Sequence, residues 1–303
     1  MTFRTRFAPS PTGPLHLGHA YSALLAQDMA FAENGEFLLR IEDIDQSRAR
    51  PEWEAQIYDD LAWLGLWWPE PVMRQSDRQT TYSAALDQLW QRGLLFECTC
   101  SRADIKSALS APQEGVQTHG PDGLIYPGTC RGNEDQAFSD LRPRPTNAVL
   151  RLDMAAACRQ ANFQPRLTGG TAWQSFTSFL ETGQLPNGQS GLIEFTPYDI
   201  EQCVGDIVLA RRDMGTSYHL SVVLDDAAQG ITHVVRGQDL FEATKIHVLL
   251  QRLLGLPTPI YHHHKLIRDE AGKRLAKRDD ARAVSLYRSE GATPDDIRSM
   301  IGL

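Results

Sequence analysis

The sequence predicts an α/β fold in which helices cover a parallel sheet, because strand-like and helix-like segments alternate along most of its 303 residues. Residues 3–7 alternate between apolar and polar side chains, as a strand does, and a Pro- and Gly-rich loop separates them from a helical pattern over residues 15–33. A near-continuous apolar run over residues 36–44 predicts a second strand. This order of strand, loop, helix and strand is the main support for a parallel sheet.

The same alternation continues along the chain. A helix is expected to begin at Pro51, with Ile57 and Leu61 on its apolar face. A further amphipathic helix is expected over residues 77–92. The later segments predict strands over residues 206–211 and 231–236, helices over residues 217–228, 242–254 and 281–290, and a short helix that begins at Thr293-Pro294.

The regular pattern is lost between Leu95 and about Phe163. Gly, Pro and Ser residues and short charged runs dominate there, which predicts an insertion rather than more sheet. The chain is therefore expected to contain the first half of the main domain (1–97), an insertion with a connective region (98–165), the second half of the main domain (166–260) and a C-terminal segment (261–303).

The composition is that of a soluble protein with a sizeable core, with 42% hydrophobic and 22% charged residues. No apolar run is long enough to cross a bilayer, and the N-terminal residues do not form a signal sequence, so a cytoplasmic location without membrane contact is expected. The net charge of −8 excludes a surface that is basic all over. Contact with a nucleic acid would have to be local, and the densest basic stretch covers residues 262–282.

A histidine pair marks the beginning of the first helix, in the sequence His16-Leu17-Gly18-His19. Two imidazoles three positions apart would lie on one face of the helix start, beside its free backbone amides and the positive end of its dipole. This arrangement predicts a phosphate site, and Gly18 would let a base or ribose lie against the backbone. On spacing alone, two solvated histidines remain the alternative.

The longer segment from Arg6 to His19 resembles the HIGH signature of the glutamyl- and glutaminyl-tRNA synthetases. The resemblance continues through residues 41–45, 218–226 and 230–237 and covers nearly the whole chain except the insertion. That family has a second ATP loop of the K-M-S-K-S kind, and residues 272–278 occupy its place here. Arg274 and Ala276 depart from its pattern, which leaves Lys277 as the matching cation.

The resemblance implies a class I synthetase with a Rossmann-type sheet that binds ATP with Mg²⁺ and activates L-glutamate. It assigns catalytic roles to His16, His19 and Lys277, and these three residues with Gly18 would bind ATP. The implied glutamate site consists of Arg6, Phe7, Ala8, Pro9, Ser10, Glu42, Tyr218 and Arg236.

The chemistry of the substrate agrees with that set, because a dicarboxylate requires fixed guanidinium groups, which Arg6 and Arg236 can supply. Glu42 is expected to bind the substrate ammonium group. The alternative for Glu42 is a salt bridge to Arg40, which we expect less because adjacent strand residues face opposite sides.

Three of the five cysteines predict a metal site rather than disulfides. Cys98 and Cys100 are two apart in a strand-like segment, so their thiols can face one ion, and Cys130 supplies a third ligand. The resemblance makes Tyr126 the fourth ligand, whereas His119 is the more conventional choice. One structural Zn²⁺ is expected within the 98–165 insertion, and three metal-free thiols are the alternative.

The chain ends at Leu303, soon after the KMSKS-like loop, and an anticodon-binding domain is not expected within residues 261–303. In this respect it resembles a truncated branch of the family, whose members attach glutamate to the queuosine base of tRNA(Asp). The implied partners are ATP, L-glutamate and tRNA(Asp) bearing queuosine. Two alternatives stay open: a shortened enzyme that charges tRNA(Glu), and a non-catalytic paralogue that binds tRNA or a nucleotide.

Overall fold

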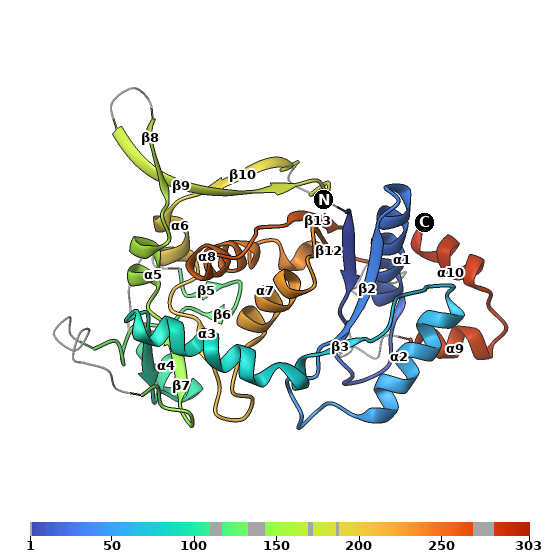
Figure 1. The fold of residues 1–303 in the computed structure, drawn as a ribbon, viewed down its shortest axis with the longest axis horizontal. Helices are drawn as coiled ribbons and strands as arrows, with labels where there is room; N and C mark the ends of the chain where they lie inside the picture. Colours follow the sequence, from blue (N-terminus) through green and yellow to red (C-terminus); the bar gives the residue numbers. More distant parts are fainter. Residues whose placement is uncertain (1, 110–116, 133–142, 169–171, 186–187, 269–281) are drawn as a thin grey trace.

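The computed structural model describes residues 2–109, 117–132, 143–168, 172–185, 188–268 and 282–303. Figure 1 shows an elongated molecule with α1 (Leu17–Ala32), α2 (Pro51–Trp63), α9 (Val284–Ser289) and α10 (Pro294–Ile301) at one end and α4 (Arg102–Leu109) at the other. The C-terminus lies beside α10 at the first of these ends, whereas the N-terminus lies nearer the middle, at the start of the blue first strand.

Parallel strands form the centre of the molecule. On one side β1 (Arg4–Phe7), β2 (Glu36–Ile41) and β3 (Met73–Arg74) pair in that order, and on the other side β12 (His233–Gly237) pairs with β13 (Ile260–His264). The backbone N–H of Thr232 joins the two groups by donating to the carbonyl of Arg4 at 3.0 Å. The predicted α/β fold with a parallel sheet is thus confirmed.

The helices follow the predicted segments closely. The segment over residues 75–92 begins as the short η1 (Gln75–Arg78) and continues as α3 (Gln79–Gln91). The second half contributes α7 (Tyr218–Ala228), the short η3 (Gln238–Leu240) and α8 (Thr244–Leu254). Ser217 and Thr293 cap α7 and α10, because each hydroxyl accepts a hydrogen bond from the backbone N–H three residues later.

After residue 163, two strand regions have no counterpart among the predictions. One is the antiparallel set β8 (Gln164–Thr168), β9 (Ala172–Glu181) and β10 (Gly191–Phe195), of which β9 joins the main sheet through Glu181 opposite Tyr261 of β13. The other is β13 itself. Its run of three histidines is polar by composition, yet His263 and His264 are buried and hydrogen-bonded.

The region between Leu95 and Phe163 contains more regular structure than expected. Besides α4 it holds β4 (Leu95–Cys98), β5 (His119–Gly120), β6 (Gly123–Leu124), β7 (Val149–Leu152) and α5 (Met154–Gln160), and α6 (Pro197–Cys203) follows later. The strand predicted over residues 206–211 exists as β11 (Val208–Ala210). It pairs antiparallel with β7, which in turn pairs with β4 on its other side. β11 therefore lies outside the parallel sheet. The domain boundaries at 97, 165 and 260 stay predictions.

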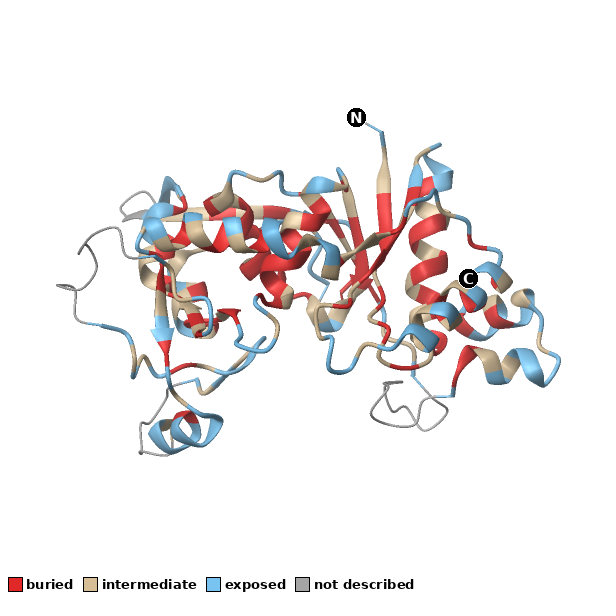
Figure 2. Cartoon of the chain, turned by 60° about the horizontal axis from the view of Figure 1, so that its bottom comes forward, coloured by how far each residue is buried: buried red, intermediate tan, exposed pale blue. Residues whose placement is uncertain are grey.

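Buried apolar residues form two large clusters (Figure 2). One packs α1, α2 and the β1–β2 strands together, and the other packs α7 and α8 against β9, β12 and β13. In contrast, α4 exposes most of its residues and buries Ile105 alone. Among the described residues no helix is both long enough and apolar enough to span a membrane.

Candidate active site

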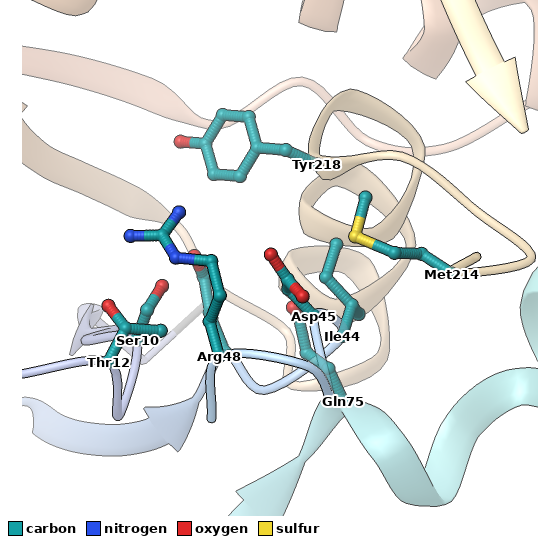
Figure 3. A pocket seen from close by; sticks show the side chains of 9 residues that line it. Ser10, Thr12, Ile44, Asp45, Arg48, Gln75, Met214 and Tyr218 are labelled. Atoms are coloured by element: carbon teal, nitrogen blue, oxygen red, sulfur yellow. The ribbon is translucent and has the colours of Figure 1, made fainter. Parts of the chain in front are cut away.

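A cavity opens beside the carboxyl ends of β1 and β2, where ligand sites of parallel sheets are expected. Figure 3 shows Ser10, Thr12 and Arg48 across the cavity from Tyr218 and Met214, and Glu42, Ile44, Asp45 and Gln75 complete the lining. Two of the residues predicted to bind glutamate after β1 and β2, Ser10 and Glu42, therefore share one cavity with Tyr218. The loop between β1 and α1 is fixed to the end of β2, because the N–H of Glu42 donates to the Pro9 carbonyl at 3.0 Å.

Beneath this cavity lies a buried cluster of charges. Asp226 of α7 accepts hydrogen bonds from Arg6 Nε at 3.0 Å and from Arg40 Nη1 at 2.7 Å, and all three side chains are nearly inaccessible to solvent. Burial by itself would raise the pKa of Asp226, but the two guanidinium groups outweigh burial and hold this pKa below its ordinary value. Arg6 is thus fixed by the protein before any substrate binds.

Glu42 makes the salt bridge to Arg40 that the sequence analysis disfavoured. The Arg40 Nη2 atom lies 3.0 Å from Glu42 Oε1. The expectation was wrong because residues 40 and 42 are two apart, and residues two apart along an extended chain point to the same side. Burial raises the pKa of Glu42, against the opposing effect of Arg40. Glu42 nevertheless lines the cavity, so its predicted role toward the substrate ammonium group stays open.

Replacing Asp226 by asparagine is expected to reduce the free energy of unfolding by about 3–5 kcal/mol, because Arg6 and Arg40 would lose their shared buried counter-ion. For a chain of this size that change corresponds to a loss of roughly 10 °C in Tm, measurable by circular dichroism.

The matched control is Asp213→Asn. Asp213 pairs with Arg211 at 2.8 Å, but both side chains are about half exposed, so a change within about 0.5 kcal/mol is expected. Equal losses in the two variants would show that the buried cluster contributes no more than a surface ion pair.

Tyr218 and Arg236 lie close to this cluster. Burial raises the pKa of Tyr218, and Glu42, Arg236 and Arg6 all act electrostatically on its hydroxyl. Arg236 is itself buried and is held by hydrogen bonds to His263, His247 and Thr244. The structure thus brings together Arg6, Glu42, Tyr218 and Arg236 from four different segments, although only Glu42 and Tyr218 of these four line the cavity of Figure 3.

The histidine pair caps the first helix. His16 Nδ1 accepts from the Gly18 N–H at 3.1 Å, His19 Nδ1 accepts from the His16 N–H at 3.2 Å, and the two rings are 3.8 Å apart. The Gly18 amide is therefore not free, contrary to expectation. A Cβ on Gly18 would lie 3.0 Å from the His16 ring, so glycine here allows the imidazole to fold over the helix start. The rings of Phe7 and His19 form a T-shaped arrangement with centroids 6.5 Å apart.

Lys277 lies outside the described residues, which resume at residue 282. Ala283 forms a β-bridge with His16, and the Val284 N–H donates to the Leu15 carbonyl at 2.8 Å. Ala283 follows Lys277 by six positions, and six residues of extended chain reach at most about 20 Å.

The three predicted cysteine ligands do converge. Their sulfur atoms lie within 4.8 Å of one another, and the Cys100 and Cys130 sulfurs are 3.3 Å apart. The Tyr126 hydroxyl is 3.5 Å from Cys100 Sγ and accepts the Cys130 N–H at 2.6 Å, so the turn at Gly128 brings residues 126 and 130 together. His119 is exposed and does not belong to this group.

The electrostatics of this group suit a thiophilic cation. Hydrogen bonding from Tyr126 lowers the pKa of Cys130 to about 6, which favours the thiolate that metals bind. Tyr126 also bonds Cys100, but burial and the two neighbouring thiols outweigh it and raise the pKa of Cys100. Arg151 donates to Cys98 Sγ at 3.3 Å and lies over the Tyr126 ring at 4.0 Å, where it offsets negative charge. Cysteine sulfurs within this distance of one another could hold a metal ion.

About one zinc per chain is expected in the purified protein, with Tyr126 completing the three cysteines. Metal analysis of Tyr126→Phe should then show reduced zinc, whereas His119→Ala should retain it, because the His119 ring lies away from the sulfur cluster. Zinc that is retained in the first variant and lost from the second would make His119 the fourth ligand.

Several residues of the site were missed from the sequence. Asp226 and Arg40 form the buried ion cluster, and Asp225 accepts from Tyr82, Gln75 and Arg78 to fix α3 and η1 to α7. The sequence did contain a signal for them. Two neighbouring carboxylates on the largely apolar helix 218–228 require charged or hydrogen-bonding partners if they are buried. The partners themselves lie about 150 to 220 positions away and could not be read from local pattern.

Fold and site together are those of a class I aminoacyl-tRNA synthetase catalytic domain. The family model described as "tRNA synthetases class I (E and Q), catalytic domain" matches residues 2–175 and 181–303, and the chain belongs to this family. Within it, the chain belongs to the glutamyl-Q tRNA(Asp) synthetases. A relative with that name from Rhodobacter capsulatus is 61% identical over 99% of both chains.

More distant relatives agree. A glutamyl-Q tRNA(Asp) synthetase from Nocardia farcinica is 38% identical over 98% of this chain and 82% of its own length. Among solved structures, a glutamate tRNA ligase from Elizabethkingia meningosepticum in complex with its amino acid has a TM-score of 0.72 and 25% identity. The chain matches that structure over its whole length but spans only 61% of the ligase.

Proposed function

We propose that this chain activates L-glutamate with ATP, without tRNA, and transfers the glutamyl group to the queuosine base of tRNA(Asp). The observation that carries the proposal is the convergence of Arg6, Glu42, Tyr218 and Arg236, together with the histidine pair that caps α1 at the end of the loop after β1. The 61% identity to a glutamyl-Q tRNA(Asp) synthetase over 99% of both chains supports the particular acceptor. The substrates ATP and tRNA support a cytoplasmic location.

Glutamate recognition would use cations that the fold already holds. Arg6 has five N–H groups, of which two point to Asp226 and one to the Val235 carbonyl, so two remain for a carboxylate. Glu42 Oε1 is bonded to Arg40, which leaves Oε2 for the substrate ammonium group. Both groups are fixed by buried partners, which reduces the entropic cost of ordering them on binding. The backbone of residues 7–10 would close the site from the β1 side.

In the first reaction, an oxygen of the glutamate α-carboxylate attacks the α-phosphorus of ATP. The bond from that phosphorus to the bridging oxygen breaks, pyrophosphate leaves, and glutamyl-adenylate forms. The protein must hold both reactants in line and neutralise charge on the phosphates, for which His16, His19 and Lys277 are the proposed groups, with Gly18 giving the nucleotide access. Mg²⁺ bound to ATP would supply further positive charge.

In the second reaction, a hydroxyl of the queuosine cyclopentenediol attacks the carbonyl carbon of the adenylate. An ester forms, AMP leaves, and the hydroxyl proton goes to the departing phosphate or to solvent. Because this diol resembles that of a ribose, the same adenylate suits either nucleophile. The proposed zinc, held by Cys98, Cys100, Tyr126 and Cys130, would be structural, since neither step requires a metal hydroxide.

Glutamate-dependent exchange of pyrophosphate into ATP tests the activation step, and we expect it to proceed without any tRNA. The glutamate and ATP residues all belong to the chain itself, so no RNA contact is needed to complete them. Exchange that appears only when tRNA is added would indicate an enzyme that behaves as an ordinary glutamyl-tRNA synthetase. The absence of exchange under both conditions would favour the non-catalytic alternative.

A further inference from the structure

The buried guanidinium group of Arg236 has no carboxylate partner within salt-bridge distance among the described residues. Its Nε atom donates to His263 Nε2 at 3.0 Å, Nη1 contacts His247 Nδ1 at 3.0 Å, and Nη2 donates to the Thr244 hydroxyl at 2.7 Å and to the Leu240 carbonyl at 3.3 Å. One N–H of Nη1 therefore remains for a ligand. Two neutral histidines hold the group, and each can accept from it only in one tautomer.

The tautomer of His263 is set by a carboxylate on the neighbouring strand. Glu181, at the end of β9, contacts His263 Nδ1 through Oε2, and the same carboxylate's Oε1 accepts the backbone N–H of His263 at 2.9 Å and that of Gly183 at 2.7 Å. With the ring proton on Nδ1, His263 Nε2 is left as an acceptor facing Arg236. Burial lowers the pKa of His263, in agreement with a neutral ring.

The surroundings of this carboxylate are closely packed. The side chains of Glu181 and His263 are both inaccessible to solvent. A Cβ on Gly183 would lie 2.1 Å from the His263 carbonyl oxygen and 2.8 Å from Glu181 Oε1, so only glycine allows the chain after β9 to approach β13 this closely. The close packing therefore holds the Glu181 carboxylate and the His263 ring in one fixed arrangement.

We propose that Glu181 is a positioning residue for Arg236, acting through His263. Glu181 fixes the tautomer of the His263 ring, and His263 Nε2 then fixes the position of Arg236 Nε. With Nε held, the remaining N–H of Arg236 Nη1 is directed at the substrate. The proposal rests on the proposed function, in which Arg236 binds a carboxylate of glutamate. It assigns to the β8–β10 strands a part in substrate recognition that the cavity lining does not reveal.

The substitution Glu181→Gln separates this role from simple packing. Two backbone N–H groups point at Oε1, so the amide oxygen must stay there and the NH₂ group must replace Oε2. His263 Nδ1 would then have to accept, and its proton would move to Nε2. That proton would face the Arg236 Nε–H at 3.0 Å, so either two donors would oppose each other or the ring would turn toward the Thr244 hydroxyl, 3.3 Å away, and its bond to Arg236 would be lost.

The test measures pyrophosphate exchange, thermal unfolding and the histidine tautomer in the same preparations. For Glu181→Gln we expect the KM for glutamate to rise about tenfold or more while the KM for ATP changes by less than about twofold. Glu181→Asp, which keeps the charge, should recover part of the loss. The matched control is Glu194→Gln on β10, whose carboxylate pairs with Arg166 at the surface and should leave both constants unchanged.

The histidine tautomer can be measured by NMR in the wild-type protein, so this part of the test does not depend on whether the variant folds. In ¹⁵N-labelled wild-type protein, His263 should carry its proton on Nδ1. A proton on Nε2 would overturn the proposal, as would a Glu181→Gln variant whose two KM values rise together or stay unchanged. Failure of the proposed function is distinguishable, because it shows as absence of exchange in the wild-type chain and leaves the tautomer reading intact.

Discussion

Radiolabelled glutamate is expected to attach to tRNA(Asp) that contains queuosine and not to the unmodified transcript of the same tRNA. The effect should be close to all-or-none, because the proposed nucleophile is a hydroxyl of the queuosine cyclopentenediol and the unmodified guanine has no such group. Filter-binding of acid-precipitated tRNA measures the label, and mild alkali should release it, as expected of an ester.

The choice of acceptor rests on the comparison of two kinds of relative. The chain is 61% identical to a glutamyl-Q tRNA(Asp) synthetase over 99% of both lengths, but only 25% identical to a glutamate tRNA ligase, of which it spans 61%. The anticodon arm and the acceptor arm of a tRNA are both helical RNA ends lined by phosphates. Shape and backbone contacts alone therefore do not distinguish one arm from the other. The queuosine diol supplies the chemical distinction.

Two further RNAs act as controls for this experiment. Purified tRNA(Glu) should stay unlabelled, and the label on tRNA(Asp) should survive removal of the 3′-terminal adenosine. Equal labelling of modified and unmodified tRNA(Asp), or labelling of tRNA(Glu) at its 3′ end, would contradict the proposed acceptor while leaving glutamate activation intact.

The sequence predicts the first half of the fold well because its signals there are local. The loop Pro9–Pro14, the histidine pair and the apolar period of the following helix lie within one short segment, and β1, α1 and β2 form as expected. Each of these features depends on neighbours a few positions apart. Local pattern is therefore sufficient where strand, loop and helix follow one another directly.

The central strand β13 could not be predicted because its signal is reversed. A buried parallel strand normally consists of apolar residues, whereas β13 contains His262, His263 and His264. Burial of His263 is possible only because Glu181, 82 positions earlier in the chain, and Arg236 supply hydrogen bonds. The residues that make β13 look unlike a strand are those that connect it to the site.

The Arg40–Glu42 pair illustrates a different failure. Residues 40 and 42 are two apart, not adjacent, so both side chains lie on one side of the extended chain and form the salt bridge at 3.0 Å. In the same region, Arg6 was identified as a substrate ligand without its buried partner Asp226. Resemblance supplies the ligand, and only the structure supplies the group that orients it.

The second large effect is expected from Lys277→Ala, which should lower the rate of glutamate-dependent pyrophosphate exchange by about 10²-fold or more. Preorganised cations stabilise charge that develops in the transition state, and removal of a single such donor typically costs this much. Ala283, six positions after Lys277 in the sequence, forms a β-bridge with His16 at the helix start where the phosphates are proposed to bind.

The matched control lies in the same loop. Arg274 stands where the family pattern has its first lysine, and Arg274→Ala removes an equal charge from a position that departs from that pattern. We expect its exchange rate to fall less than about tenfold, as for a cation that affects the phosphates through the general field of the loop. Equal losses in the two variants would indicate that the basic residues act only through their overall positive charge and that Lys277 has no specific role. An unchanged rate in Lys277→Ala would remove this lysine from the mechanism and leave His16 and His19 as the proposed groups that act on the phosphates.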